Sequence, residues 1–338
     1  MSMRVLHVAE SLKPDPGSVA VSLSGLFRAL QARAIESSHL VAEDEGTSAN
    51  GDVVSRAVSR ADLVHIHGFG YGLAGAAATA ANAASTPYVI SPLGALGQSV
   101  AGPRRVRDRL SDLFSAKRVI PGARAIGAVN DVERAELESV ARNGKVVSLP
   151  YGIDVARYRS GTPLSAELPD LPPGPCLLIL APIHPEQGFV PLLRAFAEIG
   201  ATVNPWHIVI AGRVVGDWRD ELEAAIRRKG GEKRVTFTAA PDVATQQAWL
   251  ARASLLVSPS LRIGCGVAVM QAVAGGTPVL ATRPSVPGVL SDIIGGCGPS
   301  RHEIKRALRK LIDQTEEERQ AAGRRVRDTA GDCLDWSV

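Results

Sequence analysis

Short apolar runs that alternate with longer helical segments constrain the fold of this chain more than any other feature. Such an alternation is typical of parallel β-sheets whose strands are joined by crossover helices. In a first series we expect strands at Arg4–Val8, Ser38–Ala42, Leu63–Ile66, Tyr88–Ser91, Ala125–Ala128 and Lys145–Ser148. In a second series we expect strands at Cys176–Ala181, Trp206–Ala211, Val235–Thr238, Leu255–Ser258 and Val279–Ala281.

A stretch rich in proline and glycine, from Gly161 to Pro175, separates the two series and predicts a linker. The length of 338 residues is also more than one hydrophobic core normally serves. We therefore expect an α/β protein with two Rossmann-like, doubly wound domains, at 1–160 and 176–338, joined by a linker at 161–175. Open α/β sheets bind ligands at the carboxyl ends of their strands, so a site is expected in the cleft where the domains face each other.

Composition and charge favour a cytoplasmic protein with no nucleic-acid partner. The net charge is only +4, and the basic clusters at Arg104–Arg109 and Arg324–Arg327 are expected to be solvated helix faces. Four widely spaced cysteines fit reduced thiols and match no zinc-binding spacing. The chain starts with a strand pattern in place of a signal peptide, and its longest apolar stretch, Tyr71–Ala84, is too short and too weakly apolar to span a bilayer. Peripheral membrane contact remains compatible with this composition.

Three local patterns suggest site or capping residues. Gly264 and Gly266 flank Cys265 before an apolar helix, so they either present backbone N–H groups to a phosphate or sugar oxygen or only allow close packing. His65 and His67 lie on one strand, and we expect their rings to point to opposite faces, with His67, beside Gly68, nearer the cleft. Asp131 is expected to cap the helix that follows it.

Several strand-end motifs, in this order, resemble family 4 of the retaining glycosyltransferases, which have the GT-B fold. The motifs are Asp62–Gly68 (like the family's HxHG turn), Pro87–Gly94 (SPxG), Leu149–Asp154 (PNGID), Ile208–Gly212 (IAG) and Ser258–Val279 (PSxxEGFGxxxxEAxAxGxPV). The resemblance runs from about residue 4 to residue 336. It implies an acceptor-side N-terminal domain, a nucleotide-sugar-side C-terminal domain, and sugar transfer that needs no metal or other cofactor.

The residues that would perform this chemistry depart from the family pattern. Family members hold the donor diphosphate with an arginine and a lysine, and a preorganised cation of this kind stabilises charge as it develops. Pro182 and Gln187 occupy those positions here, Ile263 and Gln271 replace a pair of glutamates, and Leu93 replaces a histidine or arginine. Gln271 keeps the ability to hydrogen-bond a ribose hydroxyl. The acceptor loop after the first strand is reduced to Gly17 and Ser18.

Arg213, Arg262 and Arg283 follow strands of the second series and are candidates to replace the missing cations, although each taken singly fits a surface arginine with no role better. The catalytic residues therefore stay unassigned. One hypothesis is a glycosyltransferase with an altered donor site that transfers a sugar from a nucleotide sugar in bacterial surface polysaccharide synthesis. A second is a catalytically inactive GT-B homologue that binds a glycan or a partner enzyme, and another GT-B chemistry, such as sugar-nucleotide epimerisation, is a third.

Overall fold

The structure is a computed structural model that describes residues 2–12, 19–42, 51–68, 72–94, 119–141, 145–159, 171–199, 205–214, 216, 218–227 and 232–336. The described strands are β1 Arg4–Ala9, β2 Glu36–Val41, β3 Leu63–His67, β4 Tyr88–Ser91, β5 Ala125–Ala128, β6 Val146–Ser148, β7 Cys176–Leu180, β8 His207–Ala211, β9 Val235–Thr238, β10 Leu255–Ser258 and β11 Val279–Ala281. The described α-helices are α1 Val19–Ala32, α2 Gly51–Ser59, α3 Gly72–Ala84, α5 Asp131–Val140, α6 Ala156–Arg159, α7 Phe189–Ile199, α8 Trp218–Arg227, α9 Val243–Arg252, α10 Val267–Gly275, α11 Ser291–Ile294, α12 Arg301–Ile312 and α13 Glu316–Ala330. Short 3₁₀ helices lie at η1 Pro185–Gln187, η3 Glu232–Arg234, η4 Arg283–Ser285 and η5 Gly288–Leu290.

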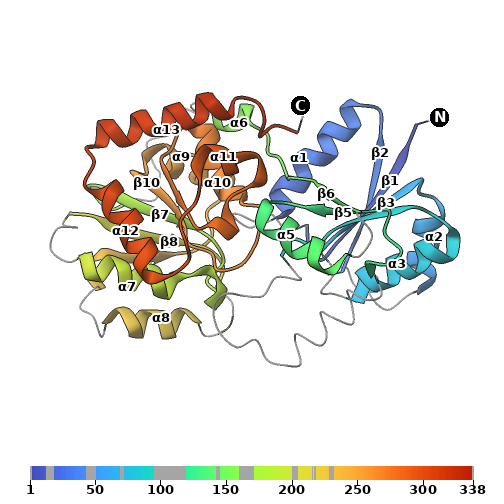
Figure 1. The fold of residues 1–338 in the computed structure, drawn as a ribbon, viewed down its shortest axis with the longest axis horizontal. Helices are drawn as coiled ribbons and strands as arrows, with labels where there is room; N and C mark the ends of the chain where they lie inside the picture. Colours follow the sequence, from blue (N-terminus) through green and yellow to red (C-terminus); the bar gives the residue numbers. More distant parts are fainter. Residues whose placement is uncertain are drawn as a thin grey trace.

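The first series of strands forms a six-stranded sheet in the order β2-β1-β3-β4-β5-β6, with every pair parallel. It builds the blue-to-green lobe of Figure 1, with α2 and α3 beside the sheet at the outer end of the molecule. Val8, Ile66 and Ile90 on three neighbouring strands are fully buried. The apolar runs therefore form the core of this lobe.

The second series forms a five-stranded parallel sheet in the order β11-β10-β7-β8-β9. All residues of the central strand β7 are buried, as expected for a parallel sheet with both faces covered. One face packs on α7, α8 and α12, which lie together at the lower edge of this lobe in Figure 1, and the other packs on α9 and α10. The fold class predicted from the sequence, α/β with two parallel sheets, is confirmed.

The start of α5 differs by one residue from the sequence prediction. The residue that caps α5 is Asn130, whose Oδ1 accepts the Glu133 N–H at 2.9 Å, whereas Asp131 is the first residue of the helix. The prediction that Asp131 is the cap is therefore wrong by one position, although its charge still lies in the first turn, where it is favourable. Most of the expected linker, residues 161–170, lies outside the described residues.

The two lobes contact each other at the N-terminus of α5, through the Asn130 side chain and through backbone groups. The Asn130 amide donates to the carbonyls of Pro284 and Val286 at 3.1 and 3.3 Å, and the Gly288 N–H donates to the Val129 carbonyl at 3.0 Å. A Cβ at Gly288 would lie 2.9 Å from that carbonyl oxygen, so only glycine allows this approach. One buried apolar cluster continues from residues of the first lobe into residues of the second.

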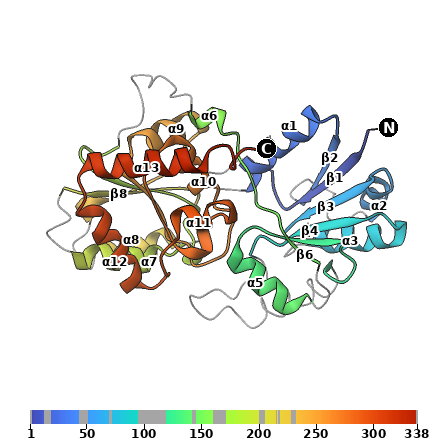
Figure 2. The ribbon, with the colours of Figure 1, turned by 45° about the horizontal axis from the view of Figure 1, so that its top comes forward.

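After α13 the chain returns to the first lobe. Figure 2 shows α13 running towards α1, and the last described residues lie between the two helices. The Ile153 N–H donates to the Leu334 carbonyl at 2.8 Å, and the Trp336 indole N–H donates to the Ser22 carbonyl in α1 at 2.9 Å. The Trp336 ring packs edge-on against Tyr151, with ring centroids 5.8 Å apart, and fills the space left by Gly25. Residues 331–336 thus lie beside residues 151–155, where the chain first passes from one lobe to the other.

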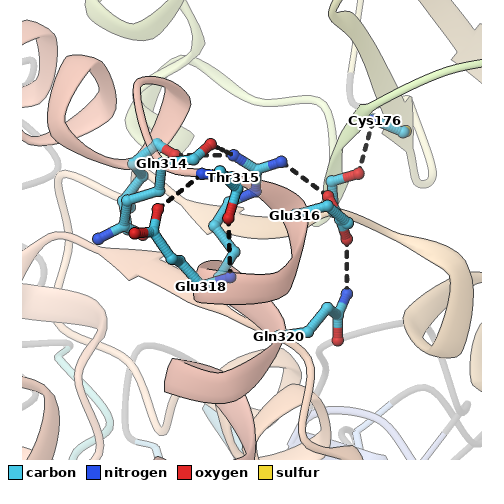
Figure 3. A network of polar contacts seen from close by, with 9 residues as sticks. Cys176, Gln314, Thr315, Glu316, Glu318 and Gln320 are labelled. Atoms are coloured by element: carbon cyan, nitrogen blue, oxygen red, sulfur yellow. Dashed lines mark hydrogen bonds and ion pairs between the residues drawn. The ribbon is translucent and has the colours of Figure 1, made fainter.

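A polar network fixes the start of α13 against the second sheet (Figure 3). Thr315 and Glu318 exchange hydrogen bonds in a capping box. The buried guanidinium of Arg319 donates to Glu316 at 2.7 Å and lies 4.7 Å from the centroid of the Trp206 ring. The direction in which α13 leaves the second lobe is therefore set by specific polar contacts.

Within the described residues, no helix has both the length and the apolar character needed to cross a membrane.

Candidate functional site

The loop that replaces the family's arginine–lysine loop, residues 181–188, follows β7 and is held by close backbone contacts. Gly188 has a φ of 71°, and a Cβ there would lie 1.9 Å from the Pro259 carbonyl oxygen. The Leu261 N–H also donates to the Glu186 carbonyl at 2.8 Å. Pro182 and Gln187 are both half-buried in this loop. The strand-end loops of β7 and β10 are therefore packed together as one surface.

Arg262, a candidate phosphate ligand, is engaged by a carboxylate of this loop. Its Nη1 lies 2.9 Å from Glu186 Oε2, and the Glu186 side chain is only 12% exposed. The His184 ring lies 3.7 Å from the same carboxylate oxygen. Burial lowers the pKa of His184, while the Glu186 charge opposes that shift. A phosphate that approaches Arg262 therefore meets a negative charge already paired with it.

We expect Glu186→Gln to raise the affinity for inorganic phosphate or a nucleoside diphosphate about two- to fivefold. The substitution removes one repulsive charge, and a partly exposed charge interaction is worth up to about 1 kcal/mol. Isothermal titration calorimetry measures the change. Glu198→Gln is the matched control, because Glu198 forms a comparable ion pair with Lys305 at 3.1 Å on the opposite side of this lobe. An equal gain in both variants, or none in Glu186→Gln, would contradict the assignment of Arg262 to an anion site.

The other two candidate arginines also lie at strand ends. Arg213 is exposed after β8, and its carbonyl accepts the Ile183 N–H at 2.8 Å. Arg283 follows β11 with 58% of its side chain exposed, and its Nη2 is 4.0 Å from Glu303. Glu303 is 35% exposed, so Arg283 can turn towards an anion without leaving a buried charge unpaired. Arg262 and Arg283 are paired with different carboxylates, Glu186 and Glu303.

Gly264 and Gly266 differ in their surroundings, and the packing role considered for this segment belongs to Gly266. Gly266 has a φ of 61°, and a Cβ there would lie 2.6 Å from the Ser285 carbonyl oxygen, so this glycine is required for close packing. Gly264 is different, because nothing lies within 4 Å of the position of its Cβ. The N-terminus of α10 has no side-chain cap, and the buried thiol of Cys265 stays neutral since burial raises its pKa to about 12. The positive helix end therefore adjoins open space at Gly264.

Gln271, expected to retain contact with a ribose hydroxyl, is fully buried and already hydrogen-bonded at both ends of its amide. Gln246 Nε2 donates to Gln271 Oε1, and Gln271 Nε2 donates to Tyr158 Oη at 2.7 Å. The amide joins α9 and α10 to α6, which follows the first passage of the chain from the first lobe to the second. In this arrangement Gln271 is a structural link, and a ribose would have to displace one of these partners.

Ile263 and Leu93 occupy an apolar contact between the lobes. Ile263 is 8% exposed, and a Cβ at Gly94 would lie 2.3 Å from its carbonyl oxygen. Leu93, with a φ of 58°, packs against the same cluster. Glu133 Oε1 accepts the Gly94 N–H at 2.6 Å, and burial raises the pKa of this carboxyl. At positions 93 and 263 the family pattern has polar residues that bind substrate. Here both positions hold apolar side chains at a place where the two lobes pack directly on each other.

The expected opposite orientation of His65 and His67 is wrong. Residues two apart on a strand share a face, and the two ring centroids are 3.9 Å apart. His67 is 3% exposed and contacts His7 and Tyr151, so it lies in the interior instead of facing an open cleft. Gly68 follows in the left-handed region, with a φ of 81°. Gly17 and Ser18 lie outside the described residues.

The sequence did not identify five polar residues whose hydrogen bonds or ion pairs shape the candidate site: Glu186, Glu133, Asn130, Gln246 and Tyr158. Most of them act through partners far away in the sequence, so no local pattern identifies them. Asn130 is the exception, because an asparagine three residues before a glutamate at a helix start is a typical capping pattern.

Comparisons with known proteins agree with this geometry. Residues 27–152 match the family model "Glycosyl transferase 4-like domain", and residues 174–314 match "Glycosyl transferases group 1". Over 195 residues the chain is 30% identical to D-inositol 3-phosphate glycosyltransferase 2 of Catenulispora acidiphila, a match that covers 54% of this chain and 45% of the relative. Over 154 residues it is 27% identical to the lipopolysaccharide core biosynthesis mannosyltransferase LpcC of Rhizobium leguminosarum bv. viciae, covering 42% of each. The matches thus span less than half the length of these two relatives.

Two solved structures extend the similarity over nearly the whole chain. Sucrose-phosphate synthase from Thermosynechococcus elongatus has a TM-score of 0.76 at 15% identity, with 99% of this chain and 95% of that chain covered. Anabaena HepE in complex with UDP and glucose has a TM-score of 0.74 at 16% identity, with 99% and 96% covered. At these identities the likeness concerns the fold.

Proposed function

Because the chain belongs to the GT-B glycosyltransferases, with both halves matched by their domain models, we propose that it transfers a sugar from a nucleotide-sugar donor. We further propose that the acceptor belongs to bacterial surface polysaccharide or glycoconjugate synthesis. The relatives support this class of reaction: one is a mannosyltransferase of the lipopolysaccharide core, and HepE is a protein bound to UDP and glucose.

The observation that carries the proposal is the uncapped N-terminus of α10 at Gly264, beside the packed loops of β7 and β10. Backbone N–H groups and the helix dipole attract an anion at such a position. In our proposal they hold the donor diphosphate in place of the missing arginine and lysine. The cations proposed to stabilise the leaving group are the three arginines that follow strands of the second lobe: Arg213, Arg262 and Arg283. No residue is assigned as the catalytic base.

A second candidate function, a catalytically inactive GT-B subunit that binds a glycan or a partner enzyme, is favoured by three contacts. The Gln271 amide is hydrogen-bonded within the protein, Arg262 is paired with Glu186, and Ile263 packs against Gly94. Gln271 and Ile263 stand where the family pattern has a pair of glutamates, and Arg262 directly precedes Ile263 in the chain. The two candidates therefore differ in whether the C-terminal lobe still binds a nucleotide.

Calorimetry against a panel of nucleoside diphosphates and nucleotide sugars, together with release of labelled sugar, tests the proposal. We expect weak binding, with a Kd above about 100 µM, or −5.5 kcal/mol, because two phosphate-binding cations are missing. Gly264→Asp should abolish it, because it places a negative charge at the start of α10. Gly51→Asp is the matched control, since Gly51 also has open space around its Cβ but starts α2 in the other lobe.

If no nucleotide binds and no sugar is released, the inactive-subunit candidate replaces the transferase. Equal binding by the wild type and Gly264→Asp would move the donor site away from α10. Binding in the low micromolar range would contradict the expected weakness and would make one of the three arginines a clamp residue, identified by changing each to alanine.

A further inference from the structure

A cluster of three histidine rings lies inside the first lobe, apart from the candidate donor site. His7 comes from β1, and His65 and His67 come from the neighbouring strand β3. Each ring offers a nitrogen atom, and these three atoms lie within 4.8 Å of one another. His7 and His67 are 1% and 3% exposed. The register of the sheet, which places His7 opposite His65, brings the rings together.

The oxygen atoms around the cluster orient two of the rings. His65 Nε2 lies 2.9 Å from Ser91 Oγ, and His67 Nδ1 contacts Tyr151 Oη. Histidines that bind metals usually use their second nitrogen in this way, on an oxygen that fixes the tautomer and the direction of the ring. The nitrogens left to face the interior of the cluster are then His65 Nδ1 and His67 Nε2.

His7 supplies the third ring, and its contacts leave part of its bonding capacity unused. Its Nδ1 faces His67 Nε2 at 3.0 Å, so these two nitrogens share at most one proton when both rings are neutral. Its Nε2 is buried without a hydrogen-bond partner among the described residues. Among the described residues the His7 ring is therefore held through Nδ1, the atom that faces the cluster.

Burial also keeps the rings in the form that binds metals. It lowers the pKa of His7 to about 4 and that of His65 to about 3, and it lowers the pKa of His67 as well. Neutral imidazole is the ligand that zinc, nickel and copper ions prefer among nitrogen donors. Two nitrogens on a tetrahedral zinc ion lie about 3.4 Å apart, given bonds of about 2.0–2.1 Å. The spacing of 3.0 Å between His7 Nδ1 and His67 Nε2 is within a few tenths of an ångström of this value.

We propose that His7, His65 and His67 bind one transition-metal ion of the zinc type. The ion would join β1 to β3 near the carboxyl ends of both strands, next to the turn at Gly68. Because Tyr151 contacts His67, the ion would also fix the start of the segment that leads to the second lobe. This site is independent of the proposed sugar transfer and is expected whether or not the protein binds a nucleotide.

The test is zinc binding by the whole protein after dialysis against a chelator. Calorimetry with Zn²⁺ should give one ion per chain, and Co²⁺ in its place should give the visible absorption of a nitrogen-ligated site. We expect His7→Gln and His65→Gln each to weaken binding at least about tenfold, the lower end of the effect measured for residues that support metal ligands. Zinc should also raise the Tm of the wild type.

The matched control is His39→Gln. His39 lies opposite His7 on β2, is exposed and stacks on Phe27, with ring centroids 6.1 Å apart, so it shares the strand position but not the cluster. Its variant should bind zinc as the wild type does. If His7→Gln does not fold, the half-buried His65 provides the second variant. Stoichiometric zinc binding that persists in both cluster variants, or wild-type protein that binds no zinc, would overturn the proposal.

Discussion

Replacing Trp336 with alanine is expected to lower the free energy of unfolding by about 3 kcal/mol, a typical cost for removing a large packed aromatic ring. The ring fills the space beside Gly25 in α1, packs edge-on against Tyr151 and donates a hydrogen bond to the Ser22 carbonyl at 2.9 Å. All three partners belong to the first lobe or to the segment leaving it. Urea unfolding followed by circular dichroism measures the change.

Two further variants separate the contributions of the ring. Trp336→Phe keeps most of the packing and should cost only about 1 kcal/mol, the worth of one hydrogen bond. Gly25→Ala should destabilise the protein, because the added Cβ would lie 2.7 Å from Trp336 Cδ1. In an exposed helix the same change stabilises by about 1 kcal/mol, so the sign is informative. Stabilisation by Gly25→Ala would show that Trp336 is not seated on α1.

Restoring the two missing cations, with Pro182→Arg and Gln187→Lys together, is expected to raise the affinity for a nucleoside diphosphate about ten- to a hundredfold. Both positions are half-buried in the packed loop after β7, so the new side chains have a rigid support and access to solvent. Hydrogen bonds from cations to phosphate are about twice as strong as those between neutral groups. Calorimetry with UDP at physiological salt measures the gain.

The control adds the same two charges elsewhere. Ser55→Arg with Ser59→Lys places them on exposed positions of α2, at the outer end of the first lobe. A similar gain in both double variants would mean a non-specific charge effect, and no gain in either would mean that the loop does not face a phosphate site. The glutamates at 263 and 271 are left out because Ile263 and Gln271 are 8% and 0% exposed, and an unpaired buried carboxylate is costly.

The sequence predicted the fold well because strand and helix periods are local properties. The runs at Cys176–Leu180 and Leu255–Ser258 form buried strands, and the order of the strand-end motifs identified the GT-B architecture. The face of a histidine on a strand was also predictable, and the error at His65 and His67 came from applying the alternation to residues two apart instead of one.

The site was predicted less completely, since its state depends on contacts between distant residues. The replacement of polar positions by Pro182, Gln187 and Ile263 is visible in the sequence. That Glu186 pairs with Arg262, 76 residues away, is not visible there. The same holds for the hydrogen bond from Gln271 to Tyr158, 113 residues away, and for the meeting of His7 with His67. The donor-site roles of Arg213, Arg262, Gly264, Gly266, Gln271 and Arg283 stay predictions.

The chain passes between the lobes at residues 151–155 and again at residues 331–336, and these two passages are joined by the hydrogen bond from Ile153 to Leu334 at 2.8 Å. Two joined connections act as a hinge with a defined axis, whereas a single connection would also allow the lobes to twist freely. Opening about this axis would separate Asn130 from Pro284 and Val286. It would also separate Gly94 from Ile263, whereas Trp336 would stay packed on α1. Access for a ligand between the lobes thus requires breaking the hydrogen bonds of Asn130 together with the apolar packing of Leu93 and Ile263.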